Sequence, residues 1–248
     1  MTDLSLPFLA AFLCTFLVAG LVKGVTGMGL PTVAMGMLGA LISPVAAAGL
    51  LLVPSFVTNV WQLFSGPGLG TIARRLWPMM VAIVIGTVIA TPLLATGGEW
   101  TGSAIGFVLI AYALYTLLAR QPAVPPRAEV WLSPLIGLIT GVVTGATGVF
   151  VVPAVPYLQA LGFNRDELVQ ALGLSFTIST MALFIGLAAQ GALAASNFAL
   201  SVSAIAPALL GMWAGTFLRR RISPTAFRRG FLIFLIVLGA ELAFRPFR

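Results

Sequence analysis

A lysine stands among glycines and a threonine inside an apolar run near the beginning of the chain. The segment GLVKGVTGMG covers residues 20–29 and places Lys23 directly before Gly24. Glycine permits the dihedral angles at which a membrane helix can break. A helix that restarts after a break exposes free N–H groups and the positive end of its dipole. Together with an ammonium group and a threonine hydroxyl, these features are typical of a site for an oxyanion.

A second segment of the same kind lies in the other half of the chain. TGATGVFVVP covers residues 144–153 and aligns with the first segment at an offset of 121 residues. The aligned positions are Gly24 with Gly145, Thr26 with Thr147, and Gly27 with Gly148. Thr144 stands where the first segment has Lys23. The two predicted halves of the site therefore differ in charge.

A cluster of polar side chains follows each of these segments. Asn59 and Gln62 lie three positions apart in PSFVTNVWQ, and Ser175 and Ser179 lie four apart in LSFTIST. Either spacing places both side chains on one face of a helix. Hydrogen bonding between helices explains these clusters as readily as ligand binding does. The predicted substrate site comprises Lys23, Gly24, Thr26, Gly27, Asn59, Gln62, Thr144, Gly145, Thr147, Gly148, Ser175 and Ser179.

Two of these features also have simpler explanations. Glycines at four-residue spacing, such as Gly20 and Gly24, commonly allow membrane helices to touch. Lys23 lies seventeen residues after Leu6 in its apolar run, so its side chain could instead extend to the membrane surface. If Lys23 lies deep, it needs an anionic partner, and no embedded carboxylate is evident in the sequence. The substrate would then supply the missing negative charge.

Other kinds of chemistry lack the residues that they require. The chain has no histidine and a single cysteine, Cys14. An enzyme of this kind needs a nucleophile together with a base or a bound metal ion. Transition-metal and haem sites need ligands of the same residue types. We therefore expect no enzyme activity, no metal site and no cofactor.

The elements that must position the candidate site are apolar helices. The 248 residues are 60% hydrophobic and 8% charged, whereas a soluble domain is about 25% charged. The mean hydropathy is +1.10. We expect an all-α polytopic membrane protein with about 8–10 transmembrane segments, since its apolar runs approach the ~20 residues that a span needs. The predicted elements are 6–23, 28–42, 45–64, 77–96, 101–119, 131–146, 149–161, 168–188, 198–218 and 229–245.

The predicted elements divide into two repeats of five. In each repeat the first pair is short or broken, and 28–42 and 149–161 could either cross the membrane or re-enter it. Arginines precede the fourth element of the first repeat but follow the equivalent element of the second. Because cytoplasmic loops collect Lys and Arg, we expect inverted repeats, which are common in secondary transporters. The predicted domains are a first transmembrane repeat at 1–119, a cytoplasmic Pro-rich linker at 120–130 and a second transmembrane repeat at 131–248.

The chain resembles the sulfite exporter TauE/SafE family of membrane anion transporters. The resemblance is carried by GLVKGVTGMG at 20–29, PSFVTNVWQ at 54–62 and TGATGVFVVP at 144–153, in the same order and over essentially the whole chain. Members of the family are inner-membrane proteins that move sulfite, sulfonates and related sulfur-containing anions, commonly outward. The resemblance implies a substrate and a multi-pass inner-membrane location of that kind. Phe150 stands where the family often has further glycines, so it would narrow the second half-site.

We therefore predict a secondary transporter that exports sulfite or an organosulfonate by alternating access. The anion would bind at the paired glycine-rich breaks near the membrane midplane. The predicted partners are a small inorganic or organic anion, the lipid bilayer, and H⁺ or Na⁺ as a coupling ion, with no nucleic acid; a homo-oligomer stays open. An anion channel or uniporter is the alternative within transport. An assembly subunit without transport activity is the alternative from another class.

Overall fold

The computed structural model describes residues 5–66, 68–98, 100–118, 123–219 and 221–245. Within these ranges the chain forms eleven α-helices and no strand, so the predicted all-α class is confirmed. The helices are α1 (Leu6–Thr26), α2 (Leu30–Leu41), α3 (Pro44–Leu63), α4 (Leu69–Ala95), α5 (Trp100–Leu118), α6 (Pro126–Thr147), α7 (Ala154–Ala160), α8 (Arg165–Ala189), α9 (Ala195–Ser203), α10 (Ile205–Leu218) and α11 (Pro224–Phe244).

Most of these helices are long, apolar and exposed on their outer side. Within the described residues, seven helical segments have the length and composition to cross a membrane. The helix α11 also has 21 residues, but it carries Arg228, Arg229 and Glu241 and is not among the seven. Large apolar side chains cover the outside, as at Trp213, which is 72% exposed. Lipid is the natural surrounding for such a surface, and the protein is a multi-pass membrane protein.

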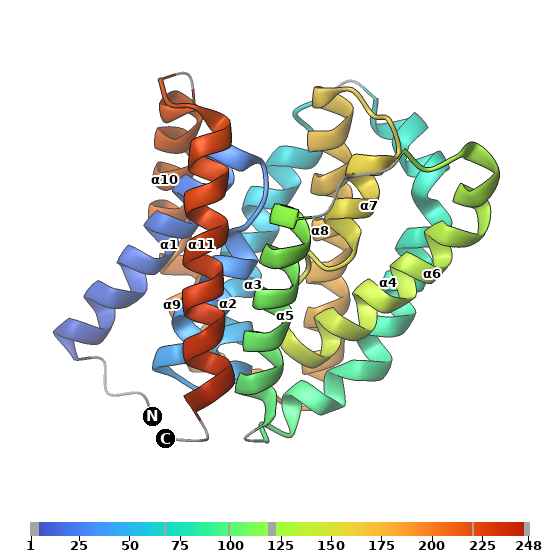
Figure 1. Cartoon of the computed structure of the whole chain (residues 1–248). Coiled ribbons are helices and arrows are strands. Elements are labelled where there is room, and N and C mark those ends of the chain that lie inside the picture. The colour runs from blue at the N-terminus through green and yellow to red at the C-terminus, as the bar shows by residue number, and fades with distance from the viewer. Residues whose placement is uncertain (1–4, 67, 99, 119–122, 220, 246–248) are drawn as a thin grey trace.

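The charged loops gather at one end of the molecule. Both termini lie at one end, and the turn between α10 and α11 lies at the other (Figure 1). At the same end as that turn, but on the other side of the molecule, Arg75 donates to the Glu129 carboxylate at 2.7 Å and to the carbonyl oxygen of Leu161 at 3.1 Å. These contacts bring together the start of α4, the start of α6 and the end of α7. The arginine-rich end is therefore the one that the sequence assigns to the cytoplasm.

Glycines bring two pairs of helices into backbone contact. Where α1 crosses α10, a Cβ on Gly20 would lie 2.2 Å from the carbonyl oxygen of Ala208. Where α6 crosses α4, a Cβ on Gly141 would lie 2.4 Å from that of Ile83. In each pair, the first helix of one predicted repeat packs against the fourth predicted element of the other repeat. The helix α1 packs on α10 in this way, and α6 packs on α4. A duplicated unit would produce this arrangement; the two repeats and their inversion stay predictions.

The helices α3 and α8 lie in the middle of the molecule, and α5 packs against α11 on one side of them (Figure 1). A Cβ on Gly173 of α8 would lie 2.6 Å from the backbone nitrogen of Leu63 on α3. This close approach buries the polar faces of both helices, including Ser55 and Asn59 on α3 and Ser175 on α8. The two polar clusters noted in the sequence thus face the interior of the protein.

Several boundaries differ from the sequence prediction. The predicted element 149–161 is helical only in α7. Residues 149–153, which precede α7, are not helical. The helix α4 begins at Leu69, so the arginine pair before the predicted start is already helical. The helix α6 begins near Pro126, inside the predicted linker, and proline suits the first turn of a helix. The predicted element 198–218 is divided between α9 and α10.

Candidate functional site

The first break ends α1 at a glycine in the left-handed region. Gly27 has a φ of 79°, and its N–H donates to the carbonyl oxygen of Lys23 at 2.7 Å. Gly29 also has a positive φ, 106°, and α2 begins at the next residue. Residues with a Cβ rarely adopt such angles. Glycine is therefore needed at both positions for the chain to turn and restart so soon.

The second break ends α6 as the first break ends α1, at a glycine in the left-handed region. Gly148 has a φ of 70°, and its N–H donates to the carbonyl oxygen of Thr144 at 2.7 Å. However, the next helix, α7, begins only at Ala154. Both breaks are therefore helix C-termini, whereas the sequence interpretation relied on helix N-termini. Only the first break is followed at once by a new N-terminus, that of α2.

The threonine of each break binds the backbone of the break itself. Thr26 Oγ1 lies 2.7 Å from the carbonyl oxygen of Met28 and accepts the N–H of the same residue at 3.2 Å. Thr147 Oγ1 donates to the carbonyl oxygen of Val143 at 2.6 Å and accepts the N–H of Val149 at 3.3 Å. A helix end leaves such backbone groups without partners. The two hydroxyls therefore stabilise the breaks.

Lys23 lies in the protein interior and does not extend to the membrane surface. Its residue is only 2% exposed. The Nζ atom donates to Thr58 Oγ1 at 3.2 Å and to Asn59 Oδ1, both on α3. These two partners are neutral, while an ammonium group can donate three hydrogen bonds. Lys23 is thus a buried cation whose charge no carboxylate balances among its hydrogen-bond partners in the described residues.

A small cavity adjoins this lysine. Its volume is about 170 Å³, and Lys23, Gly27, Gln62 and Arg219 contribute to its lining. Gln62 Nε2 donates to the carbonyl oxygen of Gly27 at 2.8 Å and to that of Val169 at 2.9 Å. The amide of Gln62 thus joins the first break to α8. Its Oε1 atom is buried and accepts no hydrogen bond from the described residues.

Asn59 connects the lysine to the opposite half of the protein. Its Oδ1 accepts from Lys23, and its Nδ2 donates to Thr180 Oγ1 on α8 at 3.2 Å. Nearby on the same two helices, the hydroxyls of Ser55, Ser175 and Ser179 are buried. Within the described residues none of these three hydroxyls has a hydrogen-bond partner. Buried polar groups are normally paired. The three hydroxyls between α3 and α8 can therefore still form hydrogen bonds with a ligand.

The predicted site residues fall into two groups. Lys23, Gly27 and Gln62 line the small cavity, and Asn59 joins them by accepting a hydrogen bond from Lys23. The residues of the second break have other neighbours. A Cβ on Gly145 would lie 2.4 Å from a backbone oxygen of α4, and one on Gly148 would lie 2.9 Å from a side chain of α2. Thr144 is buried, and its Oγ1 donates to the carbonyl oxygen of Val149 at 3.4 Å. Gly24 both packs on α10 and lines the small cavity.

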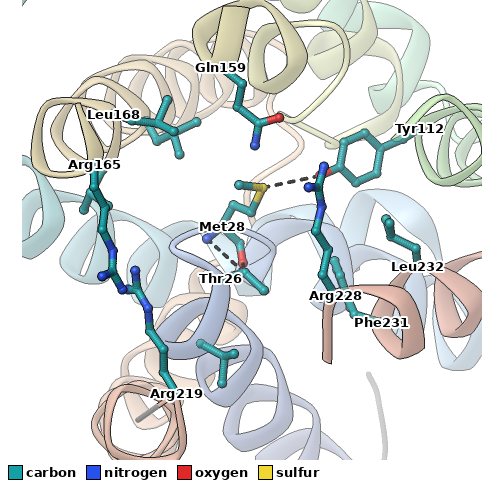
Figure 2. Close-up of a pocket in the computed structure, with 13 residues that line it drawn as sticks. Thr26, Met28, Tyr112, Gln159, Arg165, Leu168, Arg219, Arg228, Phe231 and Leu232 are labelled. Carbon is teal, nitrogen blue, oxygen red and sulfur yellow. Dashed lines mark hydrogen bonds between the residues drawn. The ribbon is translucent and has the colours of Figure 1, made fainter. Parts of the chain in front are cut away.

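A second cavity beside the first break contains residues that sequence reasoning did not select. It has a volume of about 380 Å³, and Thr26 and Met28 line it together with three arginines. These are Arg165, Arg219 and Arg228, from the N-terminus of α8, the end of α10 and the start of α11 (Figure 2). Burial lowers the pKa of Arg219, and the nearby charge of Arg165 lowers it further. In the sequence these arginines indicated only which side of the membrane their loops occupy.

The family described as Sulfite exporter TauE/SafE matches residues 12–242. This match includes both breaks, the polar clusters of α3 and α8, and all three arginines of the larger cavity. No curated protein and no solved structure matches the chain.

Proposed function

The chain belongs to the TauE/SafE family of sulfite exporters, and from this premise we propose that Lys23 is the counter-charge of the anion that it exports. Members of this family are membrane transporters, which fits our expectation that the protein is not an enzyme. We assign it a small sulfur-containing anion, sulfite or an organosulfonate, carried by secondary transport. In this proposal the binding site is formed by Lys23, Gly27 and Gln62, which line the small cavity, together with Asn59, which holds Lys23.

The observation that carries this proposal is the buried lysine with neutral partners. A charge removed from water costs several kcal/mol unless an opposite charge and hydrogen bonds compensate it. Thr58 and Asn59 supply hydrogen bonds but no negative charge. The cavity next to Lys23 is small, about 170 Å³, which suits an anion of few atoms. A bound anion would supply the missing charge and accept the third donor of the ammonium group.

The second break and the hydroxyls of α8 complete the proposed path. Thr144, Gly145, Thr147 and Gly148 end α6 with the same left-handed glycine geometry that ends α1. In Figure 1 the first break lies toward the arginine-rich end, and α6 ends nearer the termini. Ser175 and Ser179 are buried on α8. We assign these six residues to the outer half of the path, which opens when the halves of the protein rock about the contact between Asn59 and Thr180.

Sulfite flux from proteoliposomes tests this proposal. Lys23→Met keeps the length and apolar character of the side chain but removes its charge, and we expect it to lower the flux roughly tenfold or more, as losing a charge-assisted hydrogen bond does. Arg74→Gln is the matched control, because Arg74 is an exposed cation of α4 that lines neither cavity. The proposal fails if Lys23→Met transports sulfite as fast as wild type.

The same vesicles separate a transporter from a channel. In a transporter, unlabelled sulfite on the far side accelerates the efflux of labelled sulfite, because the loaded site returns faster than the empty one. An open channel shows no such acceleration and conducts a current instead. We expect acceleration by external sulfite in the wild type. Current without acceleration would replace alternating access by a channel.

A further inference from the structure

The larger cavity holds three arginine side chains whose charges are not balanced by ion pairs among the described residues. Figure 2 shows Arg165 and Arg219 pointing toward each other and Arg228 entering from the other side. The one salt bridge found in the described part of the chain is that between Arg75 and Glu129, outside this cavity. Like charges that face one another are unfavourable. An anion between them removes this repulsion.

The rest of the cavity wall is mostly apolar. Met28, Leu172, Phe231 and Leu232 line it together with the arginines. The Tyr112 hydroxyl donates to Met28 Sδ at 3.4 Å, which orients the methionine side chain along the wall (Figure 2). A volume of about 380 Å³ lies in the range of small-molecule pockets. Sulfite, with four heavy atoms and no apolar part, leaves most of this space and this wall without contacts.

The two cavities share part of their lining. Arg219 and Val169 contribute to both, while Thr26 lines the larger cavity and Lys23 lines the smaller one. The first break therefore separates the two cavities, and the guanidinium of Arg219 reaches both. Positive side chains therefore line both cavities, and Arg219 is common to the arginine-rich cavity and to that of the buried lysine.

The geometry points to the larger cavity as a second binding site, which captures organic anions that carry one sulfonate or carboxylate group on a short apolar body. The anionic group binds Arg165, Arg219 and Arg228, and the apolar body lies against Met28, Phe231 and Leu232. Arginine suits this role because its planar group donates two parallel hydrogen bonds to such an oxyanion. The role of this site in export rests on the proposed function, whereas its binding does not depend on transport.

Calorimetric titration of the purified full-length protein in a neutral detergent tests the site. The probes are hexanesulfonate, sulfite and hexylammonium, which separate the contributions of the apolar chain and of the charge. We expect hexanesulfonate to bind roughly tenfold or more tightly than sulfite, because each buried methylene group adds affinity. Hexylammonium should show no binding. Equal affinity for sulfite and hexanesulfonate, or binding of hexylammonium, would overturn the inference.

Variants locate the binding. Arg228→Gln should weaken hexanesulfonate binding about tenfold, the usual effect of removing one charge-assisted hydrogen bond. Arg229→Gln is the matched control, because Arg229 is the next residue of the same helix, is exposed and lines neither cavity. An equal loss in both variants would show an effect of overall charge and would refute the site. Displacement of hexanesulfonate by phosphatidylglycerol would refute it too, since the cavity would then hold a lipid headgroup.

Lys23→Met separates this inference from the proposed function. It should bind hexanesulfonate as tightly as wild type, because Lys23 does not line the larger cavity, while its sulfite flux falls. If Lys23→Met keeps its flux and Arg228→Gln still loses binding, the proposed function fails and the capture site stands. If the flux of Lys23→Met falls and Arg228→Gln binds normally, the proposed function stands and the capture site fails.

Discussion

Replacing Asn59 by leucine tests whether hydrogen bonding to α3 keeps Lys23 in the interior. Asn59 accepts from Lys23 and donates to Thr180. A hydrogen bond to a charged group contributes about 1.5–3 kcal/mol, and a neutral one contributes about 1 kcal/mol. Thr58 still accepts from Lys23 at 3.2 Å in the variant. We therefore expect Asn59→Leu to lower the free energy of unfolding by about 2–4 kcal/mol.

A double-mutant cycle isolates the contribution of the lysine charge. Lys23→Met alone should change stability little, because replacing a buried charge by an apolar side chain is often neutral or stabilising. In the Lys23→Met background Asn59→Leu no longer strands a charge, so its cost should fall by about 2 kcal/mol. Chemical unfolding in detergent, followed by tryptophan fluorescence, measures all four proteins. Additive effects, within about 0.5 kcal/mol, would show that the Lys23–Asn59 contact contributes nothing.

Three further changes follow from the packing. Gly145→Ala should lower the Tm by about 2–8 °C in a thermal unfolding scan, because overpacking costs about 1–3 kcal/mol. Gly102→Ala is the control and should leave the Tm unchanged, because no atom lies within 4 Å of the new Cβ. An equal fall in Tm for both variants would contradict the packing role of Gly145. Thr26→Val should cost about 1 kcal/mol by removing the hydrogen bonds between its hydroxyl and the backbone of Met28. It should also speed amide hydrogen exchange at the first break, whereas unchanged exchange would show that the hydroxyl does not hold the break. Arg75→Gln should lower the free energy of unfolding by less than about 1 kcal/mol, and by less still at high salt, because the side chain of Arg75 is 37% exposed in its pair with Glu129. A larger loss that does not depend on salt, measured by chemical unfolding, would contradict this.

The apolar runs of the sequence predict the long helices well, because their length and composition follow directly from the need to cross a membrane. They predict α7 poorly. In an apolar stretch, composition does not distinguish helical residues from extended ones, and the helix begins only after Pro153. The four-residue glycine spacing predicts close packing, and Gly20 and Gly141 lie against the backbones of neighbouring helices. Which helix each glycine contacts could not be read from spacing alone.

Sequence reasoning found the candidate site where its residues stand in short recognisable segments, as Lys23 does at the first break and Asn59 and Gln62 do in α3. The first break is a short segment, and the position of Lys23 within it could be recognised directly. Arg165, Arg219 and Arg228 belong to three separate helix ends, and only the fold brings them to one cavity. Each of them alone is indistinguishable from an arginine that sets orientation. The signal that could have selected these arginines is their location, because their loops lie at the same end of the molecule as the first break.

The direction of the helices at the breaks determines where anion selectivity can come from. Both α1 and α6 end at their breaks, so their dipoles place negative partial charge there. The N-terminus of α2 offsets this at the first break, whereas α7, with seven residues, begins only at Ala154, after the non-helical residues that follow Gly148. Lys23 stands in the last turn of α1, where a cation also complements the dipole. In the proposed path, positive potential therefore comes from side chains, namely Lys23 and the three arginines, rather than from the glycine breaks. In this proposal the breaks shape the chain so that these side chains can reach an anion.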